Sequence, residues 1–248
     1  MLLGANSNWY ADMQSAVPAA TGRRVFYPEI NFIPETWPVI TGSTAVVSIR
    51  PNPDDLLAGR LDAAISQFVH SAKNVQFLNA WHEAGNLPEY DSMSFINPQN
   101  MIKVHKYMHE LCKHSNVRYG PVMCMPPDSM PPWMPGGMDW YGLDIYDWSE
   151  FHFPNGGPLD IHGRLYPRLN QWRQVCTQVS GKRLPALRIC ETNSQFSSHR
   201  PKWFTAVGNW IKNNGDYQML TFWSSAPGAV GPWLPDDHDT IEALSNLA

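Results

Sequence analysis

Short apolar segments recur along the chain and alternate with helical patterns or with loops rich in proline and glycine. This alternation predicts parallel strands covered by helices, which is the α/β class. We count eight such segments, the number of strands that closes a single (β/α)8 TIM barrel. The predicted strands are Met1–Ala5, Arg23–Tyr27, Ala45–Arg50, Val75–Trp81, Arg118–Cys124, Trp140–Tyr146, Ala186–Cys190 and Gln218–Trp223.

Two Asn-Pro pairs mark helix starts. Asn52 can cap a helix whose first position is Pro53, and the two acidic residues that follow complement the helix dipole. Asn97-Pro98 repeats this signal. After both pairs, apolar positions recur with the helical period and predict one face that packs on the barrel. These positions are Leu57, Leu61, Ala64, Ile65 and Phe68 after the first pair, and Met101, Val104, Met108, Leu111 and Cys112 after the second.

Two further helices are predicted over Ile161–Val179 and Pro201–Asn213, the second ending at Gly215. The connection Pro126–Gly137 contains five prolines and two glycines, so it cannot form a regular helix. Trp148–Pro158 is a second irregular connection. Both follow the C-terminal end of a strand, and we therefore expect them to form walls of a cleft on the active face of the barrel.

Composition narrows the class of protein. A length of 248 residues with 43% hydrophobic content fits one catalytic barrel domain over residues 1–248. With 16% charged residues and a net charge of −4, the chain lacks the basic surface that binds nucleic acid or an anionic membrane. No apolar run is long enough for a membrane span, and Met1–Asn6 resembles a strand rather than a signal peptide. We expect either a cytoplasmic protein or a mature domain of a longer secreted or surface-associated precursor, and the oligomeric state stays open.

Cysteine and aromatic content add two expectations. The four cysteines lack metal-type spacing and occur mostly in apolar contexts, so we expect buried free thiols. The 11 Trp and 9 Tyr residues exceed what a core of this size usually needs. Most should pack in the core, whereas those at strand ends are candidates for lining a sugar-binding cleft.

Two glutamates end apolar strands. The fourth predicted strand leads into Glu83 and the seventh into Glu191. Catalytic groups of such barrels lie at the C-terminal strand ends, and these two strands lie on opposite sides, so the carboxylates should face each other across the mouth. Retaining glycosidases hold their two carboxyl groups about 5–5.5 Å apart, and inverting enzymes about 6.5–9.5 Å apart. The sequence does not fix this distance.

Several segments together form a set of motifs. They are Leu56–Asp62, His82-Glu83, Pro135–Gly137, Asp139–Tyr146, Pro185–Glu191 and Thr221–Trp223. This set resembles glycoside hydrolase family 26, a group of retaining barrel enzymes that includes β-mannanases, lichenases and β-1,3-xylanases. The resemblance covers most of the chain. It implies a retaining glycoside hydrolase that needs neither a metal nor another cofactor and whose partner is a polysaccharide or oligosaccharide.

The resemblance also implies residue roles. Glu83 takes the acid/base position with a raised pKa, and Glu191 is the ionised nucleophile that forms a covalent glycosyl-enzyme. Tyr146 would donate a hydrogen bond to Glu191 and favour its charged form. His82 can donate to a sugar or a carboxylate, and Trp223 offers a ring face to a pyranose. The remaining residues that we assign to substrate binding are Trp81, Asn86, Asp144 and Trp148.

Departures from the family leave the sugar open. Ala84-Gly85-Asn86 follows His-Glu where the family usually has Met-Asn-Gly. Asn79 stands where an arginine is common, and Cys124-Met125 where an aromatic residue is common. The resemblance therefore implies the reaction type, with a β-mannan, a β-glucan or a related microbial glycan as substrate. Short loops predict an open groove and endo attack on a chain.

Two other functions remain as alternatives. A carbohydrate-binding barrel without catalysis would keep the aromatic residues but tolerate loss of either carboxylate, whereas this chain retains both. A metal-dependent barrel hydrolase would need ligands that converge from several strands. The candidates for such a site are His82, Glu83, Asp144, Asp147 and His152.

Overall fold

The computed structural model describes residues 2–6, 22–38, 44–85, 90, 92–147, 158–183, 185–194, 196–214, 219–222 and 238–247. Three predicted site residues, Asn86, Trp148 and Trp223, lie outside these ranges. The predicted helix stop at Gly215 and nearly all of the predicted loop Trp148–Pro158 also lie outside them.

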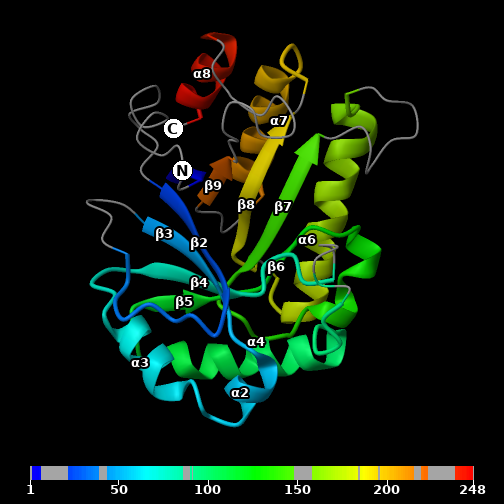
Figure 1. Cartoon of the computed structure of the whole chain (residues 1–248). Coiled ribbons are helices and arrows are strands. Elements are labelled where there is room, and N and C mark those ends of the chain that lie inside the picture. Colours follow the sequence, from blue (N-terminus) through cyan, green and yellow to red (C-terminus); the bar gives the residue numbers. More distant parts are fainter. Residues whose placement is uncertain are drawn as a thin grey trace.

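The described strands form one parallel sheet, in the order β5-β4-β3-β2-β1-β9-β8-β7-β6. Figure 1 shows these strands in the middle of the molecule, with α3 and α4 below them and α6 beside them. The strands are β1 (Leu2–Asn6), β2 (Gly22–Ile30), β3 (Thr44–Arg50), β4 (Gln76–Ala80), β5 (Val117–Tyr119), β6 (Val122–Met123), β7 (Tyr141–Asp147), β8 (Leu187–Ser194) and β9 (Met219–Phe222).

The sheet closes into a barrel through its fifth predicted strand. β5 pairs with β4 and β6 pairs with β7, while only Gly120 and Pro121 separate β5 from β6. The ladder continues across this break, because the Gly120 amide donates to the carbonyl of Leu78 on β4 at 3.1 Å and the Pro121 carbonyl accepts from Gly142 on β7 at 2.8 Å. β5 and β6 are thus one interrupted strand, and the predicted eight-stranded α/β barrel is confirmed.

Helices follow most of the described strands. Both predicted asparagine caps are present: the Asn52 side chain accepts from the amides of Asp54 and Asp55, and that of Asn97 accepts from Asn100. The predicted helix over Ile161–Val179 begins with a π-helical turn at Ile161–Leu165. The helices are α2 (Pro53–Leu57), α3 (Asp62–His70), α4 (Pro98–Cys112), α6 (Tyr166–Ser180), α7 (Arg200–Asn213) and α8 (His238–Ser245).

The single helix predicted after Asn52 is wrong, because the segment forms two helices, α2 and α3. Gly59 lies between them with φ +74°, a left-handed conformation that ends α2. The break also changes which side chains are buried: Leu57 and Ala64 are exposed, whereas Ile65 and Phe68 are buried as predicted. The predicted stripe on α4 fits better, because all of its apolar positions are buried or packed against the core.

Other expectations from the sequence agree with the structure. Pro126–Gly137 is irregular and contains only two short 3-10 turns, Pro127–Ser129 and Pro131–Trp133. All four cysteines are free and buried. No helix in the described ranges is both long enough and apolar enough to cross a membrane.

We expect the break between β5 and β6 to require glycine. A Cβ atom at Gly120 would lie 2.3 Å from the Trp140 carbonyl oxygen and 2.6 Å from its ring. Because a backbone oxygen in a closed sheet cannot move away cheaply, Gly120→Ala should lower the free energy of unfolding by about 3 kcal/mol, measured by urea unfolding.

Gly181→Ala is the control. A Cβ at Gly181 would meet no atom within 4 Å, but the residue has φ +67°, so this substitution carries only the conformational cost. We expect that cost to be about 1 kcal/mol. Equal losses in the two variants would show that the close approach at Gly120 is unimportant.

Candidate active site

Glu83 lies in a strained turn that follows β4. Trp81 and Glu83 both have left-handed backbone conformations, with φ of 55° and 56°. Such conformations cost free energy in residues other than glycine and persist only where neighbouring contacts hold them. Here the Trp81 amide donates to the Ile49 carbonyl at 3.0 Å and the Glu83 amide to the Val122 carbonyl at 2.9 Å. The turn is therefore fastened to β3 on one side and to β6 on the other.

Trp81, which the sequence assigns to substrate binding, does not line the cavity in the structure. Its ring is fully buried, and its indole N–H donates to the Pro51 carbonyl at 2.7 Å. The ring packs edge-on against Tyr90 and Phe95. The structure thus places Trp81 in the packing beneath the turn rather than in the lining of the cavity described below.

A bulge in β8 directs Glu191 into the barrel. The predicted strand ends at Cys190, but β8 continues to Ser194 and is buried throughout. Its register with β7 shifts, because Ile189 pairs with Leu143 and Glu191 with Asp144, which leaves Cys190 as an extra residue. In a regular strand without the bulge, alternation would place Glu191 on the same face as Ile189.

Contacts of the neighbouring residues show which face of β8 points into the barrel and which points outward. Cys190 packs in a cluster with Phe77, Val122 and Trp140. The hydroxyl of Thr192, one residue after Glu191, accepts from the indole of Trp203 on α7 at 2.8 Å, which is the outer face. Glu191 therefore faces the barrel interior together with Asp144.

Two groups contact the Glu191 carboxylate. The Tyr146 hydroxyl donates a hydrogen bond to it, and Nε of Arg24 on β2 lies 3.6 Å from its Oε1 atom. Burial raises the pKa of Glu191, while Arg24 and Tyr146 act in the opposite direction by favouring the charged form. Arg24 is itself fully buried, with its guanidinium 4.6 Å from the centre of the Phe26 ring.

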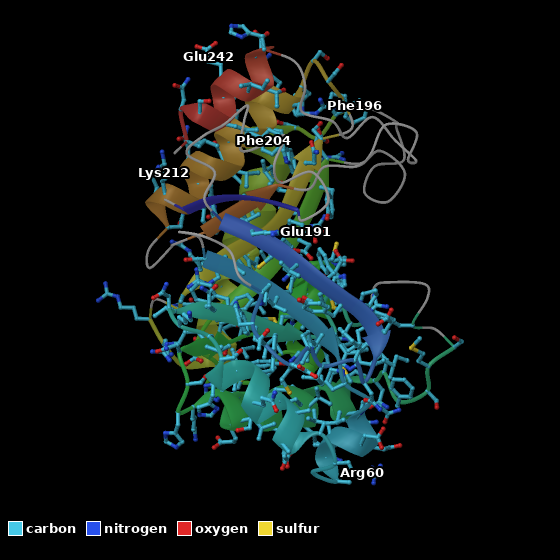
Figure 2. All side chains as sticks on the ribbon, turned by 60° about the vertical axis from the view of Figure 1, so that its left-hand side comes forward. Arg60, Glu191, Phe196, Phe204, Lys212 and Glu242 are labelled. Carbon is cyan, nitrogen blue, oxygen red and sulfur yellow. The ribbon has the colours of Figure 1, made fainter. Side chains whose placement is uncertain are left out.

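Three carboxyl groups meet at this point. One oxygen from each of Glu83, Asp144 and Glu191 lies within 4.8 Å of the others, and all three residues are buried. We call these residues the carboxyl cluster. Burial, followed by the charge of Glu191, raises the pKa of Glu83 to about 7. Figure 2 shows Glu191 deep in the middle of the molecule, whereas Arg60, Lys212 and Glu242 lie at its periphery.

A cavity of about 240 Å³ opens beside the cluster. Its lining residues are Phe26, Tyr27, Pro28, Ser48, Arg50, His82 and Glu191. The ring of His82 packs 4.7 Å from that of Phe26, and its Nδ1 atom has no hydrogen-bond partner in the described part of the chain. Burial, with help from Arg24 and Arg50, lowers the pKa of His82 well below its usual value, so His82 is neutral at neutral pH. The cavity thus offers aromatic faces and polar groups beside Glu191.

The described candidates for a metal site do not converge as a set. Among them, only Glu83 and Asp144 join the carboxyl cluster, and the positive charge of Arg24 lies beside that cluster. Asp147 is engaged elsewhere: its Oδ1 atom accepts from the Leu159 amide at 2.8 Å, and its Oδ2 atom from Ser194 and His199. His152 lies outside the described ranges.

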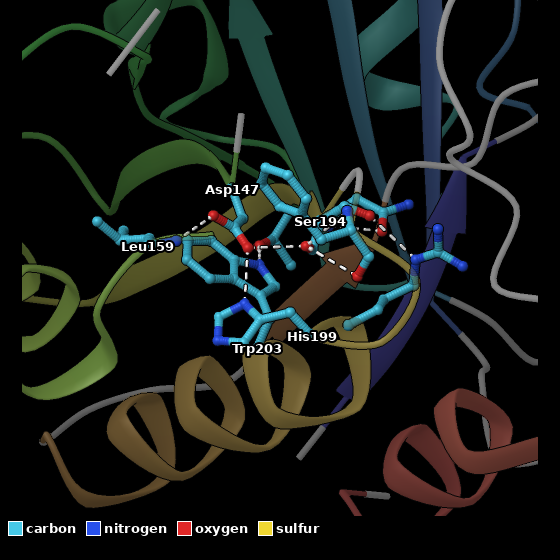
Figure 3. Close-up of polar contacts among 9 residues, drawn as sticks. Asp147, Leu159, Ser194, His199 and Trp203 are labelled. Carbon is cyan, nitrogen blue, oxygen red and sulfur yellow. Dashed lines mark hydrogen bonds and ion pairs between the residues drawn. The ribbon is translucent and has the colours of Figure 1, made fainter. Parts of the chain in front are cut away.

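The contacts of Asp147 form a network that the sequence did not reveal. The hydroxyl of Ser194 lies 2.8 Å, and Nδ1 of His199 2.7 Å, from Oδ2 of Asp147 (Figure 3). Serine and histidine thus both bind the aspartate, rather than serine binding histidine as nucleophilic catalysis would need. The network ties the C-terminal ends of β7 and β8 to the start of α7 and so fixes the strand ends that carry Tyr146 and Glu191.

Comparison with known proteins supports the fold. No protein-family model matches the sequence, and no curated protein sequence matches it either. Among solved structures, the chain is similar to a GH128 (subgroup VII) oligosaccharide-binding protein from Trichoderma gamsii, with a TM-score of 0.61, 12% identity, and coverage of 98% of this chain and 92% of that chain.

Two enzymes show comparable similarity. A ruminal GH26 endo-β-1,4-mannanase has a TM-score of 0.60 at 12% identity, covering 100% of this chain and 62% of that one. A Bacteroidetes-affiliated GH5 cellulase has a TM-score of 0.60 at 11% identity, covering 100% and 90%. The chain therefore has the barrel fold that these three proteins share, and family 26 is not distinguished from families 5 and 128.

The raised pKa of Glu83 has a consequence for stability. Below the ordinary value of 4.5, Glu83 is protonated in both the folded and the unfolded chain. As the pH rises from there to about 7, only the unfolded chain loses this proton, so the folded state loses stability. Glu83→Gln removes this penalty and should be more stable than the parent by about 3 kcal/mol at about pH 8, with no gain at about pH 4.

Urea unfolding at both pH values measures this difference. The control is Glu242→Gln, because Glu242 is exposed on α8 and its replacement should change neither value. A Glu83→Gln protein that is equally destabilised at both pH values would contradict the burial of a protonated Glu83.

Proposed function

We propose that this protein is a retaining glycoside hydrolase that attacks a polysaccharide chain internally, with Glu83 as acid/base and Glu191 as nucleophile. The observation that carries the proposal is the pair of buried carboxyl groups of Glu83 and Glu191, with oxygens within 4.8 Å of each other at the barrel mouth. This upper limit is below the roughly 6.5–9.5 Å of inverting enzymes and so favours the roughly 5–5.5 Å spacing of retaining ones.

The environments of the two glutamates support different roles. Glu83, with a pKa of about 7, keeps a proton that it can deliver to the departing oxygen. Glu191 receives the positive charge of Arg24 and the hydrogen bond of Tyr146, both of which favour the carboxylate that attacks the anomeric carbon. Once Glu191 is esterified, its charge no longer raises the pKa of Glu83. Glu83 can then act as the base that activates water.

The cavity supports binding of the sugar that is attacked. Glu191 lines it and Glu83 does not, so it lies on the nucleophile's side of the bond to be cleaved. A sugar in this cavity would meet the Phe26 ring and could accept a hydrogen bond from Arg50 or exchange one with Ser48. The neutral ring of His82 would offer a further polar contact.

An aromatic surface next to the cavity supports binding of a longer chain. β2 ends in exposed residues, and Ile30 and Phe32 are 43% and 44% exposed. Asn31, with φ 63°, holds this bend because its side chain accepts from the Asn52 amide at 2.7 Å and donates to Asp55 at 2.5 Å. We call Tyr27–Phe32 the β2 rim. A rigid rim that continues beyond the cavity favours endo attack, because it can hold sugars beyond the one that is attacked.

The substrate classes that we propose are β-mannan, β-glucan or a related microbial glycan. The similar structures include an endo-β-1,4-mannanase and a cellulase. A second candidate function is oligosaccharide binding without catalysis, favoured by the similarity to the oligosaccharide-binding GH128 protein. The carboxyl cluster argues for hydrolysis, because a site that only binds sugar gains nothing from burying two glutamates at this cost.

Hydrolysis of a polysaccharide panel tests the proposal. Mannan, cellulose, mixed-linkage glucan, β-1,3-xylan and bacterial capsular polymers are incubated with the wild type, and new reducing ends are measured. We expect release of oligosaccharides from one polymer, no release with Glu191→Ala, and a loss of about 10²–10⁴-fold with Glu83→Gln.

Controls and product analysis separate the alternatives. Glu242→Gln should release products at the wild-type rate. Proton NMR of the first product should show the anomeric configuration of the substrate, whereas an inverted product would reject retention. Oligosaccharide binding without any release, unchanged in Glu191→Ala, would reject hydrolysis in favour of the binding function. Release of terminal monosaccharide alone would reject endo attack.

The β2 rim generates a separate prediction. Phe32→Ala should leave folding unchanged because Phe32 is 44% exposed, but should weaken binding of long oligosaccharides. With hexasaccharides of the polymer that is cleaved, KM should rise about fivefold, since a ring contact contributes about 1 kcal/mol. With disaccharides KM should not change. Leu57→Ala, at an exposed apolar residue of α2, is the matched control, and an equal effect on both substrate lengths would contradict a role for the rim.

A further inference from the structure

Asp144 is the member of the carboxyl cluster to which the proposed reaction gives no task. It lies on β7 directly beside Glu191 in the sheet and is only 1% exposed. Neither of its oxygens has a hydrogen-bond donor at ordinary bonding distance in the described part of the chain. A carboxylate in this position would lack both water and N–H donors, so its charged form is strongly disfavoured.

The charges around Asp144 lead to the same conclusion. The described titratable groups that face it are Arg24 on β2, Glu83 after β4, Cys124 after β6, Tyr146 on β7, and Cys190 and Glu191 on β8. Burial raises the pKa of both cysteines and of Tyr146, so these groups are neutral at neutral pH. Among these described groups, Arg24 is then the one cation, and it faces three carboxyl groups, those of Glu83, Asp144 and Glu191.

The contacts decide which carboxyl group keeps its charge. Glu191 has the ion pair with Arg24 and the hydrogen bond from Tyr146, so the negative charge belongs there. Glu83 and Asp144 interact with each other, and burial together with the charges of Glu191 and Glu83 raises the pKa of Asp144 well above its ordinary value. Ionising all three would leave a net charge of about −2 in the barrel, which the low dielectric makes costly.

We infer that Asp144 is a positioning residue that stays protonated at neutral pH and holds the Glu83 side chain by donating its O–H to it. The cluster then contains two protons and one negative charge, on Glu191. On this inference the task of Asp144 is to orient Glu83, whereas the sequence predicts a contact with substrate. The protonation state is independent of the proposed function, and only its effect on catalysis rests on that function.

A protonated Asp144 would help both halves of the reaction. When Glu83 gives its proton to the departing oxygen, it becomes a carboxylate, and the Asp144 O–H donates to that new charge. Asp144 keeps its own proton throughout. Glu83 recovers its proton from the water that hydrolyses the glycosyl-enzyme, so the proton count is restored after each turnover.

A carboxyl carbon-13 NMR titration tests the inference without any substrate. Protein labelled at the side-chain carboxyl carbons of Asp and Glu is titrated from about pH 4 to about pH 8, and the Asp144 signal is the one missing in Asp144→Asn. We expect this signal to stay at the protonated position throughout. A signal that titrates near the ordinary value of about 4 overturns the inference, whatever the protein hydrolyses.

The titration midpoint of Glu83 in the Asp144→Asn variant gives a second test. Asparagine keeps a neutral donor of the same shape, so the titration midpoint of Glu83 should stay where it is in the wild type. If Asp144 were ionised, the same substitution would remove a neighbouring negative charge and lower that midpoint by a unit or more, on the order of a close charge pair. Asp239→Asn, at an exposed residue of α8, is the control and should change neither signal.

Activity completes the test once a cleaved polymer is known. Asp144→Asn should retain activity within about fivefold of the wild type, and Asp144→Ala should lose about tenfold to hundredfold, the size of a hydrogen bond to a charged group. The loss should fall on kcat rather than KM. Equally large losses of activity in both variants would overturn the positioning role. If the Asp144 carboxyl signal still stays at the protonated position, the protonation state would stand without that role.

Discussion

One buried arginine supports the chemistry of this barrel. Arg24 is fully buried on β2 and faces carboxyl groups that come from three other parts of the sheet. Burial alone would lower its pKa, but the negative charge of Glu191 acts in the opposite direction, so the guanidinium stays charged. Without this charge, Glu191 would lose its ion pair, and its buried carboxylate would be less favoured. The single cation therefore limits the cluster to one strong anion, and this limit separates an ionised Glu191 from a protonated Glu83.

Two backbone irregularities bring these groups together. The left-handed turn at Trp81 and Glu83 bends the chain after β4, and the bulge at Cys190 reverses the side-chain alternation of β8. Each is held by bonds to neighbouring elements rather than by its own sequence. The turn is fastened to β3 and β6, while the end of β8 is fixed by the Asp147 network. Strain of this kind persists only where the surrounding structure holds it.

The sequence predicted those features that depend on local pattern. Asparagine caps at Asn52 and Asn97, the apolar strands and the glutamates at strand ends are local signals, and the barrel prediction was confirmed. Features that depend on pairing between strands were missed. The Cys190 bulge exists only relative to β7, and the Asp147–His199 contact joins residues 52 positions apart. The position of Arg24 directly before the apolar Val25 and Phe26 was the available signal, since buried charges need partners.

The barrel keeps its buried carboxyl groups apart from the apolar side chains that stabilise the fold. Val46, Phe77, Val122 and Trp140 form an apolar cluster with Cys190, one residue before Glu191. Arg188, a second buried arginine, lies on β8 with its guanidinium 3.6 Å from the centre of the Phe77 ring. Each member of this apolar cluster is at most 5% exposed, whereas the cavity at the mouth is bounded by polar groups and ring faces. Because the strained turn and the carboxyl cluster lie at the mouth, the packed apolar cluster can hold the strands in place while the mouth remains chemically active.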